Sequence, residues 1–171
     1  EAYRQICYAL TDHFFSTIDL SSVKVLHSFL PIVKNHEPDT WIIIERLART
    51  YPAIKIALPK VDHEADNLTH IYYENKDQLK VNTWGIDEPA TGDIVAVKDI
   101  DMVLVPLLAF DTRGHRVGYG KGFYDKFLRT CRKDCRRIGL SLFAAPSPID
   151  DVGFHDQKLH TIITPGKVFS F

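Results

Sequence analysis

The sequence has few cysteines, no long apolar run and almost no net charge, and each of these shortages excludes a class of protein. Three cysteines, an odd number without a CxxC spacing, do not build a disulfide scaffold and favour a reducing, cytoplasmic compartment. No apolar run approaches the ~18 residues that cross a bilayer, and the start does not resemble a signal peptide. A formal net charge of -1 offers no general field for nucleic acid or an anionic membrane. Any bound anion must therefore be held by a local cluster of charge.

What is present is the composition of an ordinary globular protein. The 171 residues are 45% hydrophobic and 25% charged, which suits one compact domain with a sizeable core. Short apolar runs alternate with helical patterns, and no repeat or low-complexity tract interrupts them. Strands are expected at 23–30, 54–58 (closed by Pro59), 68–74, 100–106, 136–142 and 162–165, helices at 4–15, 39–50 (capped by Asp39) and 122–135, and a turn-rich loop at 84–93. The last of these helices would place Cys131 and Cys135 on its apolar stripe.

Alternating strands and helices predict an α/β fold: an open, mostly parallel sheet flanked by helices on both faces, in a Rossmann-like three-layer sandwich. In such sheets ligands bind beyond the carboxyl ends of the strands. The strongest strand signal, 100–106, runs directly into a glycine-rich stretch and then into a helix. The topology therefore directs attention to that stretch.

The stretch DTRGHRVGYGKGFYDKFL, residues 111–128, holds four of the nine glycines of the chain. Glycines let backbone N–H groups approach a ligand, and a following helix adds partial positive charge at its N-terminus. Arg116 and Lys121 add full charges, and Asp125 adds a carboxylate that suits Mg²⁺ beside a phosphate. The pattern predicts a polyphosphate cradle, although it matches neither GxxxxGK[ST] nor GxGxxG. A plain connection with solvated Arg and Lys is the alternative, with Phe123 and Tyr124 in the core and Asp125 as a helix-end charge.

The wider segment IDMVLVPLLAFDTRGHRVGYGKGFYDKFL resembles the signature of the 5-formyltetrahydrofolate cyclo-ligase family, also called 5,10-methenyltetrahydrofolate synthetases. Three further segments are similar to family motifs in the same order: NHEPDTWIII (35–44), WGIDEP (84–89) and DVGFHDQKLHTIITP (151–165). The resemblance covers residues 23 to 165. It implies ATP-driven closure of 5-formyltetrahydrofolate to 5,10-methenyltetrahydrofolate with release of ADP and phosphate, by phosphorylation of the formyl oxygen and attack by N10.

The resemblance also implies a set of site residues. Catalytic roles would fall to Arg116 and Lys121, and Mg²⁺ would be held by Asp125 and Asp156. Folate would contact Glu37, Trp84, Tyr119 and Phe123. ATP would be bound by Arg116, Gly118, Tyr119, Gly120, Lys121, Gly122, Phe123 and Tyr124. The resemblance further implies a single domain over residues 1–171 and a monomer, with no nucleic-acid or membrane partner.

Some positions depart from the family pattern. Leu107 stands where glycine is usual, Phe123 replaces a tyrosine, and His160 replaces an acid of the closing motif. The family also has a basic N-terminal helix whose lysine reaches ATP; this chain opens at Glu1, so we expect that helix to be incomplete. Arg4 lies too far along the chain to take over that role.

Alternatives stay open for individual residues and for the whole protein. Glu37 could simply sit in a loop before a helix, Trp84 could belong to the core, and His115 and His155 could hold a metal or act as a base. The protein could be a sugar-phosphate or coenzyme A ester enzyme on a similar sheet, which ATP-independent activity would reveal. It could instead be a non-catalytic nucleotide- or folate-binding relative, which would bind both ligands without turnover.

Overall fold

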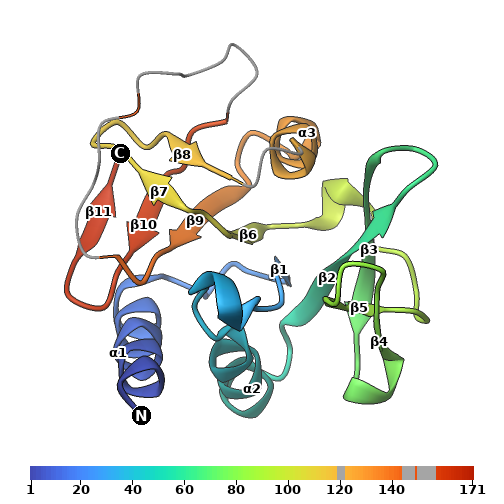
Figure 1. The fold of residues 1–171 in the computed structure, drawn as a ribbon, viewed down its shortest axis with the longest axis horizontal. Helices are drawn as coiled ribbons and strands as arrows, with labels where there is room; N and C mark the ends of the chain where they lie inside the picture. The colour runs from blue at the N-terminus through green and yellow to red at the C-terminus, as the bar shows by residue number, and fades with distance from the viewer. Residues whose placement is uncertain (119–121, 144–148, 150–156) are drawn as a thin grey trace.

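The computed structural model of the protein describes residues 1–118, 122–143, 149 and 157–171, and within them a seven-stranded sheet forms the centre of the molecule (Figure 1). The strand order is β11-β10-β9-β6-β1-β2-β3. The five inner strands run parallel, while β3 and β11 are antiparallel at the two edges. The strands are β1 (Val25–His27), β2 (Lys55–Asp62), β3 (Asn67–Tyr73), β6 (Met102–Val105), β9 (Arg136–Leu140), β10 (Thr161–Ile163) and β11 (Val168–Ser170). The expected open, mostly parallel sheet is confirmed.

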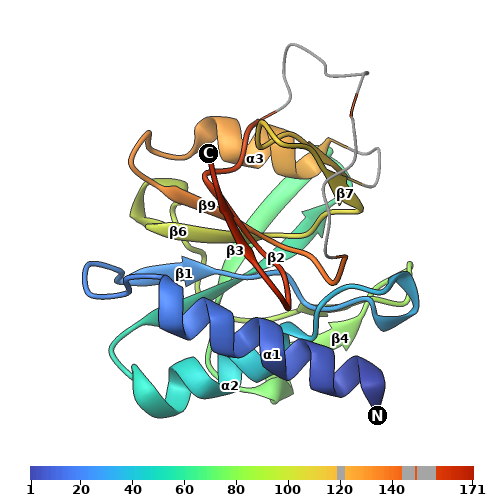
Figure 2. The same cartoon turned by 90° about the vertical axis from the view of Figure 1, so that its left-hand side faces the viewer.

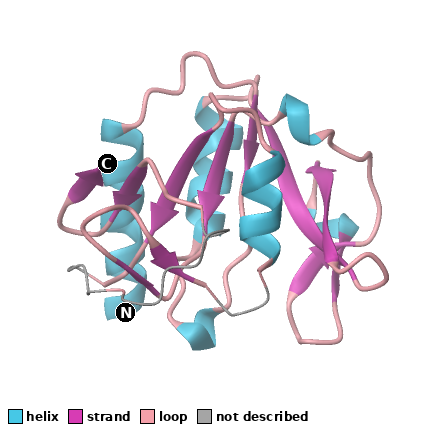
Figure 3. Ribbon diagram, turned by 90° about the horizontal axis from the view of Figure 1, so that it is seen from above, coloured by secondary structure: helices cyan, strands magenta, loops and turns pink. Residues whose placement is uncertain are grey.

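Helices cover both faces of this sheet. Helices α1 (Ala2–Thr17) and α2 (Thr40–Thr50) pack on one face, and α3 (Phe123–Thr130) packs on the other (Figures 1 and 2). Seen from above, the strands lie between the two helical layers (Figure 3). Each layer closes its own apolar cluster against the sheet, one built on α1 and α2 and the other on α3. Among the residues that the structure describes, no helix has both the length and the apolarity needed to cross a membrane.

Helix α2 forms as its sequence predicts. The side chain of Asp39 caps it by accepting a hydrogen bond from the backbone N–H of Trp41 at 3.1 Å. Ile43, Ile44 and Leu47 are buried on the side that faces the sheet. The cap fixes where the loop after β1 ends, and so fixes the position of the residues just before the helix.

Strand β2 does not end at Pro59, contrary to the prediction. It continues to Asp62, and Pro59 pairs with His70 of β3. The parallel pairing of β2 with β1 stops at Ala57. The backbone N–H position of residue 59 points toward β1, as that of Ala57 does, but β1 has already ended there. The missing N–H of proline therefore costs no hydrogen bond between strands.

The helix predicted over 122–135 is also shorter than expected. α3 ends at Thr130, and Cys131 has extended backbone with φ -68° and ψ 156°. Arg132 Nη2 then donates to Oδ1 of Asp101, the residue before β6, at 2.8 Å. The backbone N–H of Cys135 donates to the carbonyl of Arg132. This ion pair ties the segment to the sheet, so Cys131 and Cys135 do not share a helical face. All three cysteines are free thiols.

Several short elements lie outside the sequence prediction. A hairpin of β4 (Leu79–Val81) and β5 (Asp87–Pro89) overlaps the expected loop at 84–93, and β7 (Ala109–Phe110) and β8 (Arg116–Val117) form a second hairpin inside the glycine-rich stretch. Strands of two or three residues carry too little periodicity to be recognised. Three 3₁₀ turns complete the description: η1 (Val33–Asn35), η2 (Lys76–Gln78) and η3 (Val97–Asp99).

Candidate functional site

Two of the segments that carry predicted site residues leave the sheet at the same edge because of its parallel pairing. β1 and β6 are parallel neighbours, so the chain leaves both strands at the same edge. The loop after β1 carries Glu37 and leads to α2. The segment after β6 forms the β7–β8 hairpin and leads to α3 (Figure 1). The sheet thus brings Glu37 and the glycine-rich stretch, which are far apart in sequence, to a common edge.

Asp111 organises the hairpin that begins the glycine-rich stretch. Its Oδ1 accepts backbone hydrogen bonds from Arg113 at 2.8 Å and His115 at 2.9 Å. Its Oδ2 lies 2.9 Å from Nδ1 of the buried His115 ring. Burial raises the pKa of Asp111, but these hydrogen bonds outweigh it and hold the pKa below its usual value. Sequence reasoning gave Asp111 no role, although D-T-R-G is a turn signal.

The same geometry bears on His115, for which a metal or base role was an alternative. One nitrogen of its ring is already engaged with Asp111. Within the described residues, no group of three or more His, Cys, Asp or Glu could hold a metal ion. His115 therefore acts as part of the hairpin's internal hydrogen bonding. His155 lies outside the described residues.

Arg116 and Asp125, which were assigned to separate ligands, are joined by an ion pair. Arg116 Nη2 donates to Asp125 Oδ1 at 3.2 Å, and their side chains are 5% and 23% exposed. A Cβ at Gly118 would lie 2.8 Å from Arg116 Nη1, so glycine leaves room for the guanidinium against the backbone. The pair links β8 to the first turn of α3, on either side of the glycines.

The closing segment of the chain meets this ion pair. The backbone N–H of Gln157 donates to Asp125 Oδ1 at 3.0 Å. The second oxygen of Asp125 accepts no hydrogen bond from the residues that the structure describes. Mg²⁺ usually keeps several waters and binds through one or two carboxylates together with substrate phosphates, so this oxygen fits such an ion. Asp156, the other expected ligand, lies outside the described residues.

Gly122 begins α3 in a conformation that favours glycine. It has φ 71° and ψ 8°, and it provides no side-chain cap to the helix. The positive end of the helix dipole therefore lies at Gly122, where a glycine leaves the backbone accessible to a ligand. Tyr124 is half-buried and packs against both apolar clusters, as the alternative interpretation of this aromatic had it. Tyr119, Gly120 and Lys121 lie outside the described residues.

An exposed aromatic wall stands beside the start of α3. Trp84, in the β4–β5 hairpin, is 44% exposed, so the alternative that it belongs to the core is wrong. The centroid of its ring lies 6.4 Å from that of Phe123 and 5.1 Å from that of His63. Two residues expected to contact folate, Trp84 and Phe123, are thus neighbours although 39 positions separate them.

Glu37 is only 3% exposed and is tied into its own loop. Its Oε2 accepts a hydrogen bond from the backbone N–H of Ile32 at 2.6 Å, and its carbonyl accepts one from the Tyr3 hydroxyl at 2.8 Å. The carboxylate therefore has a structural role in shaping the loop after β1. Its role toward folate stays a prediction.

Two departures from the family pattern have structural roles. Leu107 is buried, and its Cδ2 would lie 2.8 Å from a Cβ at Gly139, so it fills space over β9. His160 accepts a hydrogen bond through Nδ1 from the backbone N–H of Arg137 at 3.0 Å. In place of an acid, position 160 thus carries a side chain that fastens the closing segment to β9.

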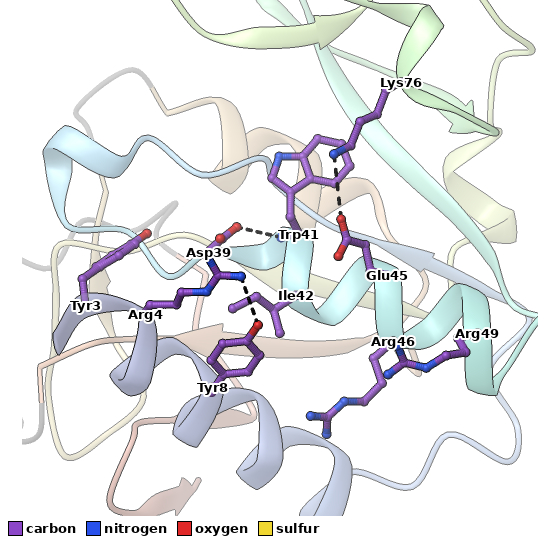
Figure 4. Close-up of a pocket in the computed structure, with 10 residues that line it drawn as sticks. All are labelled: Tyr3, Arg4, Tyr8, Asp39, Trp41, Ile42, Glu45, Arg46, Arg49 and Lys76. Atoms are coloured by element: carbon purple, nitrogen blue, oxygen red, sulfur yellow. Dashed lines mark hydrogen bonds and ion pairs between the residues drawn. The ribbon is translucent and has the colours of Figure 1, made fainter. Parts of the chain in front are cut away.

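A polar cavity of about 500 Å³ between α1 and α2 contains none of the expected site residues (Figure 4). The cavity is lined by Tyr3, Arg4, Tyr8, Asp39, Trp41, Ile42, Glu45, Arg46, Arg49 and Lys76. Within it Arg4 donates to Tyr8 and Lys76 lies near Glu45, while Arg46 pairs with Asp12, which does not line it.

The comparison with known sequences identifies relatives over nearly the whole chain. A family model described as the 5-formyltetrahydrofolate cyclo-ligase family matches residues 3–165. The 5-formyltetrahydrofolate cyclo-ligase of Escherichia coli strain K12 is 27% identical over an alignment of 191 positions, gaps included. This alignment covers 98% of this chain and 99% of that protein. The probable 5-formyltetrahydrofolate cyclo-ligase of Schizosaccharomyces pombe is 31% identical over 111 residues, which cover 56% of this chain and 54% of that protein.

Solved structures share the fold. The NMR structure of Aquifex aeolicus 5,10-methenyltetrahydrofolate synthetase superposes with a TM-score of 0.80 at 24% identity, over 99% of this chain and 82% of that one. A 5,10-methenyltetrahydrofolate synthetase from Mycoplasma pneumoniae superposes with a TM-score of 0.68 at 19% identity, over 96% of this chain and 87% of that one. At these identities the structural likeness concerns the fold, and the family model agrees with the resemblance of the signature motifs.

Proposed function

The chain belongs to the 5-formyltetrahydrofolate cyclo-ligase family, and from this premise we propose that it closes 5-formyltetrahydrofolate to 5,10-methenyltetrahydrofolate at the expense of ATP. One observation carries the proposal. The Arg116–Asp125 ion pair spans the glycine-rich stretch and receives the backbone N–H of Gln157 from the closing segment. Two motifs of the family signature thereby converge on a single carboxylate at the edge of the sheet where α/β proteins bind ligands.

The proposed reaction needs positioning and charge neutralisation more than a protein nucleophile. The formyl oxygen attacks the γ-phosphorus of ATP, an O–P bond forms, and the bond to the β-phosphate oxygen breaks as ADP leaves. N10 then attacks the activated formyl carbon and loses its proton, and the C–O bond breaks with release of phosphate. Such a path gains most from fixed geometry, from cations around the phosphoryl group and from exclusion of water.

The glycine-rich stretch suits the ATP phosphates. Backbone N–H groups of residues 118–124, at the start of α3, would bind phosphate oxygens, and Lys121 would add a second positive charge. Arg116 lies buried against Asp125, so we infer that it acts mainly by fixing that carboxylate while its charge stabilises the transferring group. Asp125 and Asp156 would hold Mg²⁺, which neutralises phosphate charge when bound with ATP.

The folate would lie against the aromatic wall. Trp84 and Phe123 present neighbouring rings at the start of α3, and an extended pterin ring suits such a surface. Tyr119 belongs to the same loop and would border both ligands. Glu37 would act through the loop after β1, whose shape it controls by accepting the Ile32 hydrogen bond.

We further propose that the chain works as one cyclo-ligase domain over residues 1–171, as a monomer in the cytoplasm, with ATP and 5-formyltetrahydrofolate as its partners. The free cysteines suit a reducing compartment. Neither nucleic acid nor a membrane is expected as a partner, given the net charge of -1.

The test is the appearance of methenyltetrahydrofolate absorbance when the protein, Mg-ATP and 5-formyltetrahydrofolate are mixed. ATP-dependent product formation is expected, with loss of turnover in Asp125→Asn. Product formation without ATP would favour an enzyme of another class. Binding of both ligands without product would identify a relative that has kept its site and lost its chemistry.

A further inference from the structure

Two buried histidines lie beneath α3 without belonging to any motif of the glycine-rich stretch. His27 is the last residue of β1 and is 0% exposed, and His70 on β3 is 3% exposed. Their rings touch through His27 Nε2 and His70 Nδ1, which are 2.9 Å apart. Sequence reasoning missed both, because a single histidine in an apolar strand carries no signal of its own.

The contact is possible because of a small residue between them. β2 separates β1 from β3 in the sheet, and Ala57 of β2 pairs with His27 on one side and with Tyr72 on the other. Ala57 shares the face of the sheet toward α3 with both histidines. Because its side chain is a methyl group, the two imidazoles can meet over β2.

One arrangement of this hydrogen bond avoids an N–H without an acceptor on His27. His27 Nδ1 has no hydrogen-bond partner among the described residues. If His70 donated, the proton of neutral His27 would sit on Nδ1 as an orphaned N–H, which is costlier than a bare lone pair. His27 Nε2–H therefore donates to His70 Nδ1, and the proton of His70 is on its Nε2.

The pair forms the surface on which α3 rests. The centroid of the Phe127 ring lies 4.7 Å from that of the His27 ring and 4.1 Å from that of the His70 ring. The centroid of the Tyr124 ring lies 6.4 Å from that of His27. Phe127 is 4% exposed, so this contact is a central part of the packing of α3 on the sheet. Asp125 stands between Tyr124 and Phe127 in sequence, on the same helical turn that starts from Gly122.

We propose that His27 and His70 are positioning residues: a neutral dyad, with His27 donating to His70, that seats α3 and so places Asp125 and the glycine-rich stretch for Mg-ATP. The part that concerns ATP rests on the proposed function. The dyad touches no expected ligand, so its effect on the reaction passes through Phe127 and Tyr124. A phenyl ring at position 27, which is larger and has no N–H, would leave His70 Nδ1 without a donor and shift the position of α3.

The first test is a nitrogen NMR spectrum of the histidine side chains in the whole protein, which needs no turnover. Two imidazoles are expected in the Nε2–H tautomer at pH 7, and both signals should change in His27→Gln. An Nδ1–H tautomer or an imidazolium at either position would overturn the dyad. Hydrogen exchange of the α3 amides should be at least 10-fold faster in His27→Phe than in His27→Gln; equal rates would overturn the seating.

The second test separates positioning from general stability. In His27→Phe the KM for Mg-ATP is expected to rise about 10-fold, with a smaller rise in the KM for 5-formyltetrahydrofolate, because Phe123 lies on α3 while Trp84 does not. His27→Gln, which keeps an N–H donor, should restore the wild-type values. His13→Phe, on the opposite face of the sheet, is the control. Equal changes in both KM values, or none, would contradict the positioning role. Absence of ATP-dependent turnover in the wild type would contradict the proposed function, and the positioning role with it, while the spectrum would still decide the dyad.

Discussion

At the scale of single residues, the site depends on how one carboxylate is held. Asp125 Oδ1 receives both the Arg116 guanidinium and the Gln157 N–H. A carboxylate fixed by two donors loses little freedom when it binds a cation or a phosphate-bound ion, which is the usual benefit of preorganisation. The same pairing explains why a charged arginine is tolerated at 5% exposure.

Removing Arg116 should therefore damage both stability and activity. Arg116→Ala leaves Asp125 partly buried without its cation, and we expect a loss of about 3 kcal/mol in the free energy of unfolding together with a fall in kcat/KM of more than about 100-fold. Arg116→Lys keeps the charge without the fork and should be intermediate. Urea unfolding and steady-state kinetics measure the two effects. Arg49→Ala, an exposed arginine on α2, is the matched control; equal effects of the two alanine variants would refute the role of the pair.

At the scale of elements, the β7–β8 hairpin depends on a glycine with a left-handed backbone. Gly114 has φ +89°, and a Cβ there would lie 2.8 Å from the Leu159 carbonyl oxygen. Gly114→Ala should lower the free energy of unfolding by about 2 kcal/mol or more, because strain and a backbone clash act together. Gly166→Ala serves as the control, since nothing lies within 4 Å of a Cβ at that turn. A Gly114 variant as stable as the Gly166 variant in urea unfolding would show that the hairpin is not constrained in this way.

The buried pair of His27 and His70, on which α3 packs, should make the stability of the protein depend on pH. Burial lowers the pKa of His70 to about 4 and that of His27 well below its usual value. The unfolded chain, with a histidine pKa of about 6.5, then binds protons first, so stability is complete above about pH 6.5 and falls on acidification toward pH 4. From pH 7 to pH 5 the loss from His70 alone should be about 2 kcal/mol.

Denaturant titrations at the two pH values measure this loss. His70→Gln should remove the share of His70 and leave that of His27, whereas His13→Gln should leave the dependence unchanged. Tyr124 of α3 faces His27, and the ammonium of Lys55, on the same face of β2 as Ala57, lies over the Tyr72 ring. Burial and, for His27, the neighbouring His70 lower the pKa values, and no carboxylate among the described residues acts against them. A stability independent of pH over this range in the wild type would disprove the neutral, buried pair.

Elements that rely on local signals were predictable, and those fixed by distant partners were not. The cap of α2 is set by Asp39 and its own first turn, and it formed where expected. The end of α3 is set by the ion pair of Arg132 with Asp101, which lies 31 residues away, and the continuation of β2 through Pro59 depends on where β1 stops. A short stretch of sequence around α3 or β2 contains neither the ion-pair partner nor the end of β1, so local patterns could not predict these boundaries.

At the scale of the molecule, the aromatic wall of Trp84 and Phe123, where we propose that folate binds, joins two distant segments. Trp84 and Phe123 come together because the β4–β5 hairpin reaches the start of α3. Trp84→Ala should raise the KM for 5-formyltetrahydrofolate about 10-fold or more with little change in the KM for Mg-ATP, consistent with the ~1–3 kcal/mol of a stacked aromatic contact. Trp41→Phe leaves Trp84 as the only tryptophan, and its fluorescence should then change when folate binds. Fluorescence that is insensitive to folate, with an unchanged KM, would exclude Trp84 from the site.

The sequence named the residues of the candidate site, but not the contacts between them. The glycine-rich stretch and the family motifs predict Arg116, Asp125, Trp84 and Phe123 as site residues, and the structure pairs Arg116 with Asp125 and Trp84 with Phe123. Their roles toward ATP and folate stay predictions. Their pairing depends on the fold: the sheet puts the loops after β1 and β6 at one edge, and the closing segment returns to Asp125. The contact between His27 and His70 depends on Ala57 of β2, which lies between β1 and β3. This relation exists only in the assembled sheet.

The central claim is that one site couples ATP cleavage to ring closure. The most direct measurement is the amount of ADP and of 5,10-methenyltetrahydrofolate formed by the wild-type protein from Mg-ATP and 5-formyltetrahydrofolate in the same reaction. The account predicts equal amounts of the two products, with neither formed when one substrate is omitted. Methenyltetrahydrofolate without ADP, or ADP without methenyltetrahydrofolate, would contradict it.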